Sequence, residues 1–220
     1  MKVVRTFDPL GLPSPLWVLG TDTGVGKTYA ASLIARVWAK AAPVIYRKPF
    51  QTGVPSEAHA EADAVALAGQ GITAETGLVF RAPLSPLAAA EIDGIRIDSG
   101  LLDEMSAWCR RPVPDVAGLI LEAAGGVMVP LAEGVLFADW ASALRIPAIV
   151  VARGGLGTLN HVLLTCAALK SRGWDVAAVA LNPGLDGSFE AAGGNADMLE
   201  RFLDVPVCMV AGDRRPVVGG

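Results

Sequence analysis

The sequence predicts a single-domain α/β protein with a mostly parallel β-sheet and helices on both faces. Apolar residues make up 52% of the 220 residues and charged residues only 18%, which suits central strands that are buried on both faces. Short apolar runs alternate with helical patterns from end to end, with no linker or repeat between them; this order is typical of a parallel sheet. A glycine-rich turn joins the first apolar run to the first helical pattern.

The elements are expected in the following order. Residues 1–15 form a Pro- and Gly-rich N-terminal extension, and residues 16–220 form the single domain. We predict strands at 16–19, 44–47, 116–122, 148–151, 176–181 and 207–210. We predict helices from 28 to the break at Pro43, and at 59–67, 101–110, 137–144, 160–172 and 189–202. The KPFQTG segment should be a turn, and 69–100 irregular with one or two short helices.

The glycine-rich turn lies within WVLGTDTGVGKT, residues 17–28. Its layout is typical of a phosphate-binding loop, in which backbone N–H groups and the positive end of a helix dipole bind phosphate oxygens. Lys27 would reach the terminal phosphates, and the Thr28 hydroxyl would hold Mg²⁺. Thr21 stands where the common pattern has its first glycine, so this loop is a lengthened variant. A chance glycine-rich turn is the alternative, but both flanks match the expected strand and helix.

Unusual residues follow five of the predicted strands: GTDTGVGK, KPFQTG, EAAGG, RGGLGTLNH and NPG. Turns require the glycines, but they do not require the Lys, Glu and Asn residues beside them. In a parallel sheet, ligands bind beyond the carboxyl ends of the strands. The sequence therefore predicts a site at that edge of the sheet.

Two side chains in these segments, and one outside them, are candidates for phosphoryl chemistry. Lys48 by itself fits a solvated turn lysine, but near the loop it would neutralise a transferred phosphoryl group. Glu122 ends an apolar strand, where a carboxylate is costly unless it binds a cation or a donor. Mg²⁺ held by Thr28, Glu122 and Asp63 would satisfy it; Asp63 fits an exposed acid on a polar helix equally well.

Two asparagines and a histidine are less specific. Asn160 precedes an apolar helix, and we favour a helix N-cap for it. Asn182 with Pro183 could be turn chemistry, or it could present an amide to an adenine edge. We interpret His161 as structural, because it has no partner residues that would form a catalytic triad.

Charge, cysteine content and the N-terminus narrow the class of protein. The net charge of −4 gives no electrostatic case for nucleic acid. Cys109, Cys166 and Cys208 are widely spaced, as expected for free thiols in a reducing compartment. The broken apolar pattern at the N-terminus argues against a signal peptide, and no run is long enough to span a membrane. We therefore expect a cytoplasmic protein.

With these residues collected, the chain resembles the dethiobiotin synthetase family. The resemblance runs from Leu16 to Asn182, and the pairing of the lengthened loop with KP-x-x-[ST]-G is its most specific part. The matching segments are GTDTGVGKT at 20–28, RKPFQTG at 47–53, ADA at 62–64, APLSP at 82–86, LEAAGGVMVPL at 121–131, FADW at 137–140, LGTLNH at 156–161 and LNP at 181–183.

The resemblance implies a P-loop NTPase-like fold and an ATP-dependent ligase of biotin biosynthesis. Such an enzyme uses ATP, Mg²⁺ and CO₂ or bicarbonate to close the ureido ring of dethiobiotin on 7,8-diaminononanoate. One substrate amine captures CO₂ as a carbamate, whose oxygen attacks the γ-phosphate; the second amine then displaces phosphate from the mixed anhydride. The resemblance also implies a homodimer with the substrate at the subunit interface.

By the same resemblance, the site residues have four roles. Catalytic roles are expected for Lys48, Lys27 and Thr23. Nucleotide and cofactor contacts are expected at Gly24, Val25, Gly26, Lys27, Thr28, Tyr29, Asp63, Glu122, Gly125, Asn182 and Pro183. Substrate contacts are expected at Thr52 and at Gly157, Thr158, Leu159 and Asn160, and Mg²⁺ ligands at Thr28, Asp63 and Glu122.

Two departures and two alternatives accompany this interpretation. Ala123 replaces a glycine that is common in the family, and VCMVAGDRRP at 207–216 departs from the usual base-binding segment. A regulatory ATPase of the ParA/MinD type is the main alternative, but its loop carries an extra lysine that is missing from Thr21–Gly24. A non-catalytic nucleotide-binding module is the other, and the presence of Lys48 beside the Mg²⁺ carboxylates argues against it.

Overall fold

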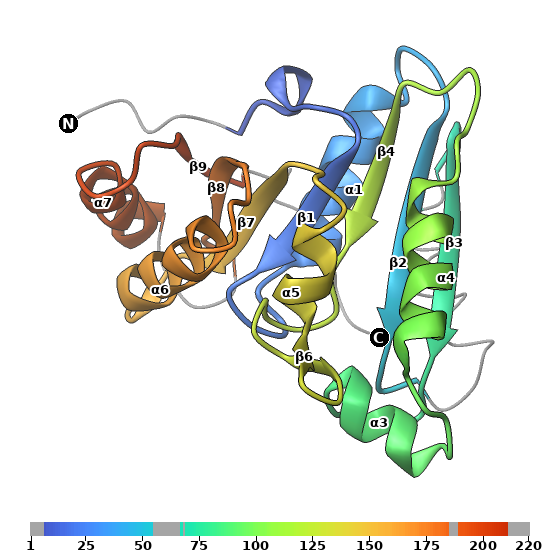
Figure 1. The fold of residues 1–220 in the computed structure, drawn as a ribbon. Coiled ribbons are helices and arrows are strands. Elements are labelled where there is room, and N and C mark those ends of the chain that lie inside the picture. Colours follow the sequence, from blue (N-terminus) through green and yellow to red (C-terminus); the bar gives the residue numbers. More distant parts are fainter. Residues whose placement is uncertain (1–6, 55–66, 68, 185–188, 211–220) are drawn as a thin grey trace, which may run out of the picture.

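Within the residues that the structure describes, seven parallel strands form the central sheet (Figure 1). The structure is a computed structural model, and it describes residues 7–54, 67, 69–184 and 189–210. The strand order is β3-β2-β4-β1-β7-β8-β9. The bounds are β1 (Leu16–Gly20), β2 (Val44–Gln51), β3 (Ile72–Val79), β4 (Gly118–Glu122), β7 (Ala148–Arg153), β8 (Val176–Asn182) and β9 (Val207–Met209).

Helices cover both faces of this sheet, as predicted (Figure 1). The helix α1 (Lys27–Trp38) packs on one face, and α4 (Ser99–Arg110), α5 (Phe137–Ser142), α6 (Thr158–Lys170) and α7 (Phe189–Leu199) pack on the other. Alternate side chains of β1 supply both cores: Leu16 and Val18 face α1, whereas Trp17 and Leu19 face the opposite layer. The buried apolar runs of the sequence are thus strands enclosed on both sides.

Two parts of the chain differ from the prediction: residues 69–100 and the strand before them. Residues 69–100 contain an edge strand, β3, as well as the expected short helix α3 (Pro86–Ile92). KPFQTG is largely strand rather than turn, because β2 continues to Gln51. Pro49 fits inside β2 because the pairing with β4 ends at Arg47, so no ladder bond to β4 is lost there. An added Cβ at Gly77 would meet the Pro49 carbonyl oxygen, so β3 needs a glycine there.

Three smaller features also differ from the prediction or lie outside the described residues. The short strands β5 (Pro130–Ala132) and β6 (Val135–Leu136) form an antiparallel pair that the sequence did not predict. The helix α6 begins at Thr158 with Gly157 as its N-cap, so Asn160 lies within the first turn and is not the cap. The helix predicted at 59–67 lies almost entirely outside the described residues.

The described part of the N-terminal extension packs onto the domain. The Trp38 Nε1–H donates to the carbonyl oxygen of Pro9 at 2.8 Å. The Ser14 hydroxyl accepts from the backbone N–H of Leu119 at 3.1 Å, and Phe7 is buried in the core beneath α1. The segment from Pro9 to Ser14 therefore lies at the edge of the sheet at which β4 begins, whereas the Phe7 N–H donates to the Met209 carbonyl oxygen at the end of β9, at 3.2 Å.

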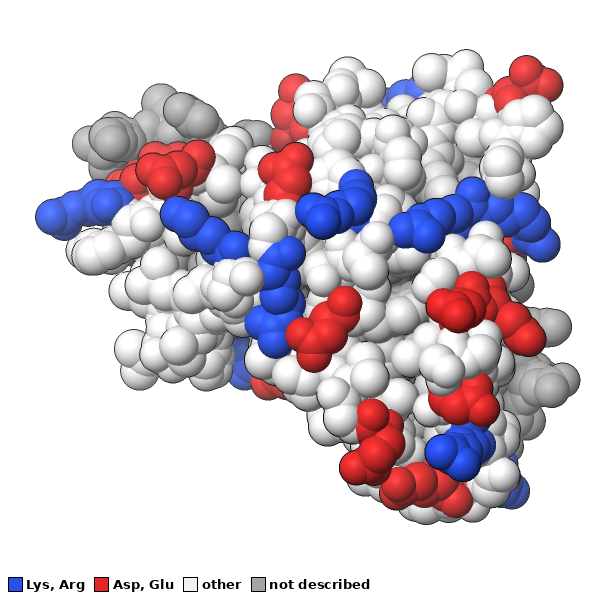
Figure 2. All heavy atoms as spheres, viewed as in Figure 1, with Lys and Arg blue, Asp and Glu red and all other residues white. Residues whose placement is uncertain are grey.

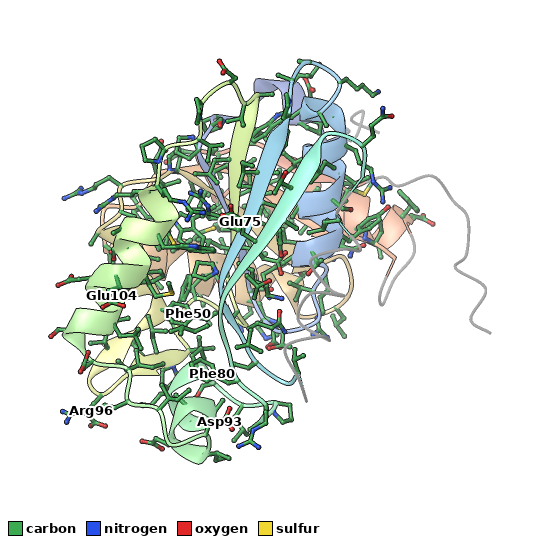
Figure 3. All side chains as sticks on the ribbon, turned by 90° about the vertical axis from the view of Figure 1, so that its right-hand side faces the viewer. Phe50, Glu75, Phe80, Asp93, Arg96 and Glu104 are labelled. Atoms are coloured by element: carbon green, nitrogen blue, oxygen red, sulfur yellow. The ribbon has the colours of Figure 1, made fainter. Side chains whose placement is uncertain are left out.

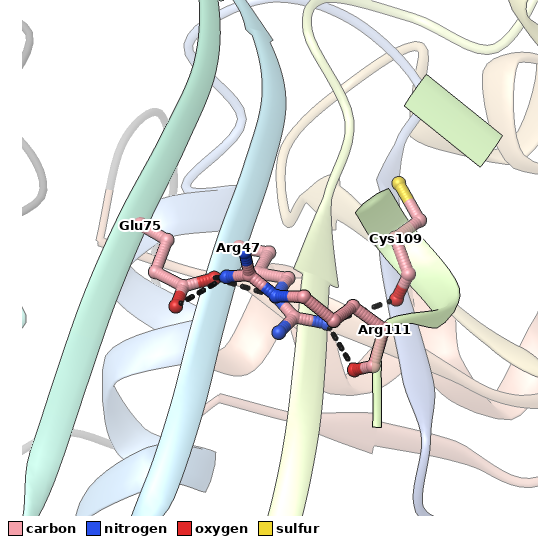
Figure 4. A network of polar contacts seen from close by, with 4 residues as sticks. All are labelled: Arg47, Glu75, Cys109 and Arg111. Atoms are coloured by element: carbon pink, nitrogen blue, oxygen red, sulfur yellow. Dashed lines mark hydrogen bonds and ion pairs between the residues drawn. The ribbon is translucent and has the colours of Figure 1, made fainter. Parts of the chain in front are cut away.

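A buried arginine ties β2 to its neighbours (Figure 4). Arg47 is fully buried and donates from Nε to Glu75 Oε2 on β3 at 2.7 Å. Its Nη1 donates to the carbonyl oxygens of Cys109 and Arg111, at the end of α4, and its guanidinium lies over the Trp108 ring. Figure 3 shows Glu75 at this edge of the sheet, with buried Phe50 and Phe80 nearer α4 and α3. The network fixes the strand from which Lys48 projects.

Candidate functional site

A cleft of about 650 Å³ opens where β1, β2 and β4 end. This is the edge of the sheet at which the sequence predicted a site. Its walls come from the loop before α1, the end of β2, the segment before α3 and the segment after β4. The lining residues are Thr23, Gly24, Gly26, Lys27, Thr28, Tyr29, Lys48, Gln51, Thr52, Pro83, Leu84, Ser85, Pro86, Glu122, Ala123, Ala124, Gly125 and Val129.

The loop between β1 and α1 has the backbone of a phosphate-binding loop. Gly24 and Gly26 have φ angles of +71° and +96°, which only glycine adopts at little cost. Gly26 is the N-cap of α1, and no side chain caps the helix. The first N–H groups of α1 therefore remain for an anion, where the helix dipole also favours negative charge.

Lys27 is held along the loop rather than in bulk solvent. Its Nζ donates to the Asp22 carbonyl oxygen at 2.9 Å, and its stem runs so close to Gly20 that a Cβ there would lie 2.9 Å from Lys27 Cδ. Burial lowers the pKa of Lys27 from 10.5 to about 8, and nearby Lys48 lowers it too, whereas Glu122 and Asp22 oppose the shift. A buried cation at the mouth of the loop is a fitting partner for phosphate oxygens.

Glu122 is the centre of the polar contacts in the cleft. Its carboxylate is 1% exposed, and Oε1 accepts from the Thr28 hydroxyl at 2.8 Å. Lys48 Nζ lies 3.5 Å from the same oxygen. Oε2 accepts from the Tyr46 hydroxyl at 2.9 Å. The ends of β2 and β4 and the start of α1 thus bring a carboxylate, a lysine and a hydroxyl into contact, although Thr28 and Glu122 are 94 residues apart in the sequence.

Most of the residues predicted to bind the nucleotide, and several predicted to act in catalysis or to bind substrate, lie in this cleft. Thr23, Gly24, Gly26, Lys27, Thr28, Tyr29, Lys48, Thr52, Glu122 and Gly125 all line it. Val25 is buried beneath the loop. Asn182 stands behind the loop: its Nδ2 donates to the Val25 carbonyl oxygen at 3.3 Å, and its Oδ1 accepts from the Gly184 N–H. One hydrogen of that amide group remains for another acceptor.

Other predicted residues lie elsewhere. Gly157–Asn160 form the start of α6 and do not line the cleft of their own chain. Asn160 is exposed, whereas the Thr158 hydroxyl is buried and has no hydrogen-bond partner among the described residues. Pro183 follows Asn182 at the end of β8. Asp63 and residues 212–214 lie outside the described residues.

Two parts of this site were not predicted from the residues themselves. Tyr46 was assigned no role, although it lies two residues before Lys48 in a strand and therefore on the same face. The segment Pro83–Pro86 lines the cleft, but its APLSP sequence entered only as part of the family resemblance. Period-two alternation along VIYRK would have identified Tyr46, had the strand been extended beyond Arg47.

Comparison with known proteins supplies the family. A family model described as an AAA domain matches residues 15–211. The ATP-dependent dethiobiotin synthetase BioD of Anaeromyxobacter sp. (strain Fw109-5) is 39% identical over 172 residues, which cover 76% of this chain and 75% of that protein. The chain belongs to the dethiobiotin synthetase family.

Two further comparisons are consistent with that family. The BioD dethiobiotin synthetase of Bacillus licheniformis is 36% identical and covers 87% of this chain and 82% of its own length. Chloroplast FtsY from Physcomitrella patens has a TM-score of 0.50 at 17% identity, covering 92% of this chain and 61% of that one, which shows the fold alone. The P-loop NTPase-like α/β fold expected of a dethiobiotin synthetase is confirmed.

The described residues give no sign of a membrane span or of a clustered metal site. Among the described residues, no helix is long and apolar enough to cross a membrane. No group of three or more His, Cys, Asp and Glu side chains in the described ranges could hold a metal by itself. Figure 2 shows basic and acidic side chains interspersed over one face of the molecule. The cleft, which has one carboxylate and two lysines among its described lining residues, is the candidate site of this dethiobiotin synthetase family member.

Proposed function

We propose that this protein is an ATP-dependent dethiobiotin synthetase, which closes the ureido ring of dethiobiotin from 7,8-diaminononanoate, CO₂ and ATP. The observation that carries the proposal is the convergence of Lys48 and Thr28 on Glu122 beside Lys27, in one cleft of a chain from this family. The loop supplies nucleotide binding, and Lys48 supplies a second cation for a phosphoryl acceptor. A ParA/MinD-type regulatory ATPase is less well supported, because the relatives are synthetases.

The chemistry has three steps. An amine nitrogen of the diamine attacks CO₂ and loses a proton, giving a carbamate. A carbamate oxygen attacks the γ-phosphorus, and the bond to the bridging oxygen breaks to release ADP. The second amine attacks the carbon of the resulting mixed anhydride, loses a proton and expels phosphate. Phosphorylation is needed because a bare carbamate is a poor electrophile.

The side chains of the cleft divide this work. Lys27 and Lys48 neutralise charge on the phosphates and on the carbamate, which favours the transition state of phosphoryl transfer. Thr23 and Thr52, which line the same cleft, contact the diamine or its carbamate. The backbone from Gly24 to Thr28 holds the phosphates, and Asn182 with Pro183 contacts the base.

Mg²⁺ fits the donors of this cleft. It prefers oxygen ligands and is bound through one or two carboxylates together with substrate phosphates. Thr28 Oγ1 and Glu122 Oε1 lie 2.8 Å apart and supply such donors, and we assign Asp63 as a further ligand. When bound, Mg²⁺ would neutralise charge on the phosphate oxygens.

A homodimer would allow Gly157–Asn160 to contact a substrate. These residues do not line their own cleft, so we assign them to the carboxylate tail of a substrate bound in the other subunit. Leu156 and Leu164 are 103% and 63% exposed, and Met128 is 45% exposed. Leu164 and Met128 line a hollow of about 390 Å³ that also includes Thr23, so an apolar interface there would reach the site. The three buried thiols fit a cytoplasmic protein.

Release of ADP tests the function. Purified protein is given ATP, Mg²⁺ and bicarbonate, with and without 7,8-diaminononanoate, and ADP and dethiobiotin are measured. We expect ADP release that depends on the diamine and is matched by dethiobiotin. Slow ATP hydrolysis that is indifferent to the diamine would instead favour a regulatory ATPase.

A further inference from the structure

The Tyr46 hydroxyl makes a buried contact with the second oxygen of Glu122. It donates to Oε2 at 2.9 Å, and both residues are 1% exposed. The other oxygen, Oε1, faces the Thr28 hydroxyl and Lys48 Nζ. The two carboxylate oxygens therefore have different partners: one meets a core residue, and the other meets the residues of the cleft.

The pairing of β2 with β4 explains why the two carboxylate oxygens have different partners. Tyr46 and Lys48 are two residues apart on β2, so their side chains leave the same face. Tyr46 is paired with Ile120 on β4, and Glu122 lies two residues further along that strand and again on the same face. The Tyr46 ring packs in the core beneath α1, and only its hydroxyl reaches forward to the carboxylate.

We propose that Tyr46 is a positioning residue that fixes the Glu122 carboxylate and leaves only Oε1 to bind a cation. The proposal rests on the role proposed above for Glu122 as a Mg²⁺ ligand. Mg²⁺ requires near-ideal octahedral geometry, whereas Ca²⁺ accepts bidentate carboxylates and more ligands. A carboxylate whose second oxygen is occupied suits the smaller ion, so Tyr46 favours Mg²⁺ over Ca²⁺.

The Tyr46→Phe variant separates this role from packing. It keeps the buried ring and removes only the hydroxyl, so that Oε2 loses its donor and the carboxylate is free to turn. Loss of an outer-shell partner typically lowers metal affinity by about 10- to 100-fold. A merely structural hydroxyl would change the stability of the protein without changing its response to metal.

The experiment measures the affinity for a non-hydrolysable ATP analogue by isothermal titration calorimetry, in EDTA, in Mg²⁺ and in Ca²⁺. For Tyr46→Phe we expect the affinity in EDTA to stay at the wild-type value. We expect the enhancement by Mg²⁺ to fall about tenfold and the ratio of the Ca²⁺ enhancement to the Mg²⁺ enhancement to rise. A variant with wild-type enhancements for both ions would overturn the proposal.

Two further variants make the result specific. Ser106→Ala removes a half-buried hydroxyl that donates to the Leu102 carbonyl oxygen, accepts from Trp140 Nε1 and does not line the cleft; its metal response should match the wild type. Glu122→Gln should lose the enhancement. If Glu122→Gln loses the enhancement by metal and Tyr46→Phe keeps it, only the positioning role of Tyr46 is wrong. If Glu122→Gln keeps the enhancement, the proposed metal role of Glu122 is wrong, and the role of Tyr46 fails with it.

Discussion

The amide of Asn182 occupies the space in which a side chain at Gly26 would lie. A Cβ built on Gly26 would overlap Asn182 Nδ2, and that nitrogen donates to the Val25 carbonyl oxygen at 3.3 Å. The end of β8 therefore buttresses the phosphate-binding loop from behind. Two segments 157 residues apart in sequence set one loop conformation.

Gly26→Ala should disrupt both the loop and its support. The left-handed φ of +96° costs alanine about 1–2 kcal/mol, and the new methyl group must also displace Asn182. Gly24→Ala is the matched control, because its φ is +71° but no atom lies within 4 Å of the added Cβ. We expect a larger loss of ADP affinity and of unfolding free energy for Gly26→Ala, measured by calorimetry and urea unfolding. Equal losses would show that Asn182 yields without cost.

Lys48→Ala should abolish turnover and leave nucleotide binding largely intact. Lys27 and the backbone of the loop hold the phosphates, whereas Lys48 Nζ lies beside Glu122 at 3.5 Å. We expect dethiobiotin formation to fall at least about a hundredfold, with ADP affinity within a few-fold of wild type. An ADP affinity that drops in parallel with turnover would contradict this division of work.

Arg47→Met should destabilise the protein much more than Arg111→Ala. Arg47 is fully buried, and its loss removes one of the two arginines that donate to Glu75 and the guanidinium donor of two carbonyl oxygens. We expect a loss of about 2–4 kcal/mol in unfolding free energy. The Arg111 side chain also contacts Glu75 but is 54% exposed, so its removal should cost less than about 1 kcal/mol. Urea unfolding of the two variants distinguishes these values.

The three cysteines should be unreactive in the native protein. Burial raises the pKa of Cys109 and of Cys208 to about 12 and that of Cys166 to about 11, and the thiolate is the reactive form. We expect Ellman's reagent at pH 8 to label native protein at least about a hundredfold more slowly than unfolded protein. Rapid labelling of one thiol in the folded protein would locate an opening near that residue.

The same thiols predict how stability varies at high pH. Because the native state keeps these protons to a higher pH than the unfolded chain does, the unfolded chain loses its protons first. Stability should therefore fall as the pH rises from about 9 towards 11–12. Urea unfolding across this range measures the slope, and alanine at Cys208 should reduce it.

Leu164→Asp should separate the proposed dimer. The side chain is 63% exposed and borders the hollow beside Thr23, where a charge would be costly to bury. We expect a dimer to become a monomer in light scattering, with loss of dethiobiotin formation. Phe202→Asp is the control, because Phe202 is also exposed, at 66%, and lies after α7. A wild-type protein that is monomeric would overturn the proposed interface.

Much of the fold followed from the sequence because buried strands and helices have distinct apolar periods. β1, β4, β7, β8 and β9 were predicted as strands, since each is an apolar run within a two-sided core. The strand β3 was missed because ITAETGLV contains Glu75 and Gly77. Gly77 is needed because the Pro49 carbonyl oxygen comes close to it, and Glu75 accepts a hydrogen bond from Arg47. Neither partner is near β3 in the sequence.

The chemical groups of the site could be predicted from the order of residues alone: the phosphate-binding loop, the two lysines and the carboxylate near the strand ends. These signals are local, because consecutive residues form the strand, the glycine turn and the start of the helix. Which of these groups come into contact depends on the folded arrangement of the chain. The contacts of Glu122 with Tyr46 and Thr28, and of Asn182 with the loop, depend on strand order and register. Those are set by the packing of distant segments, which no single stretch of sequence encodes.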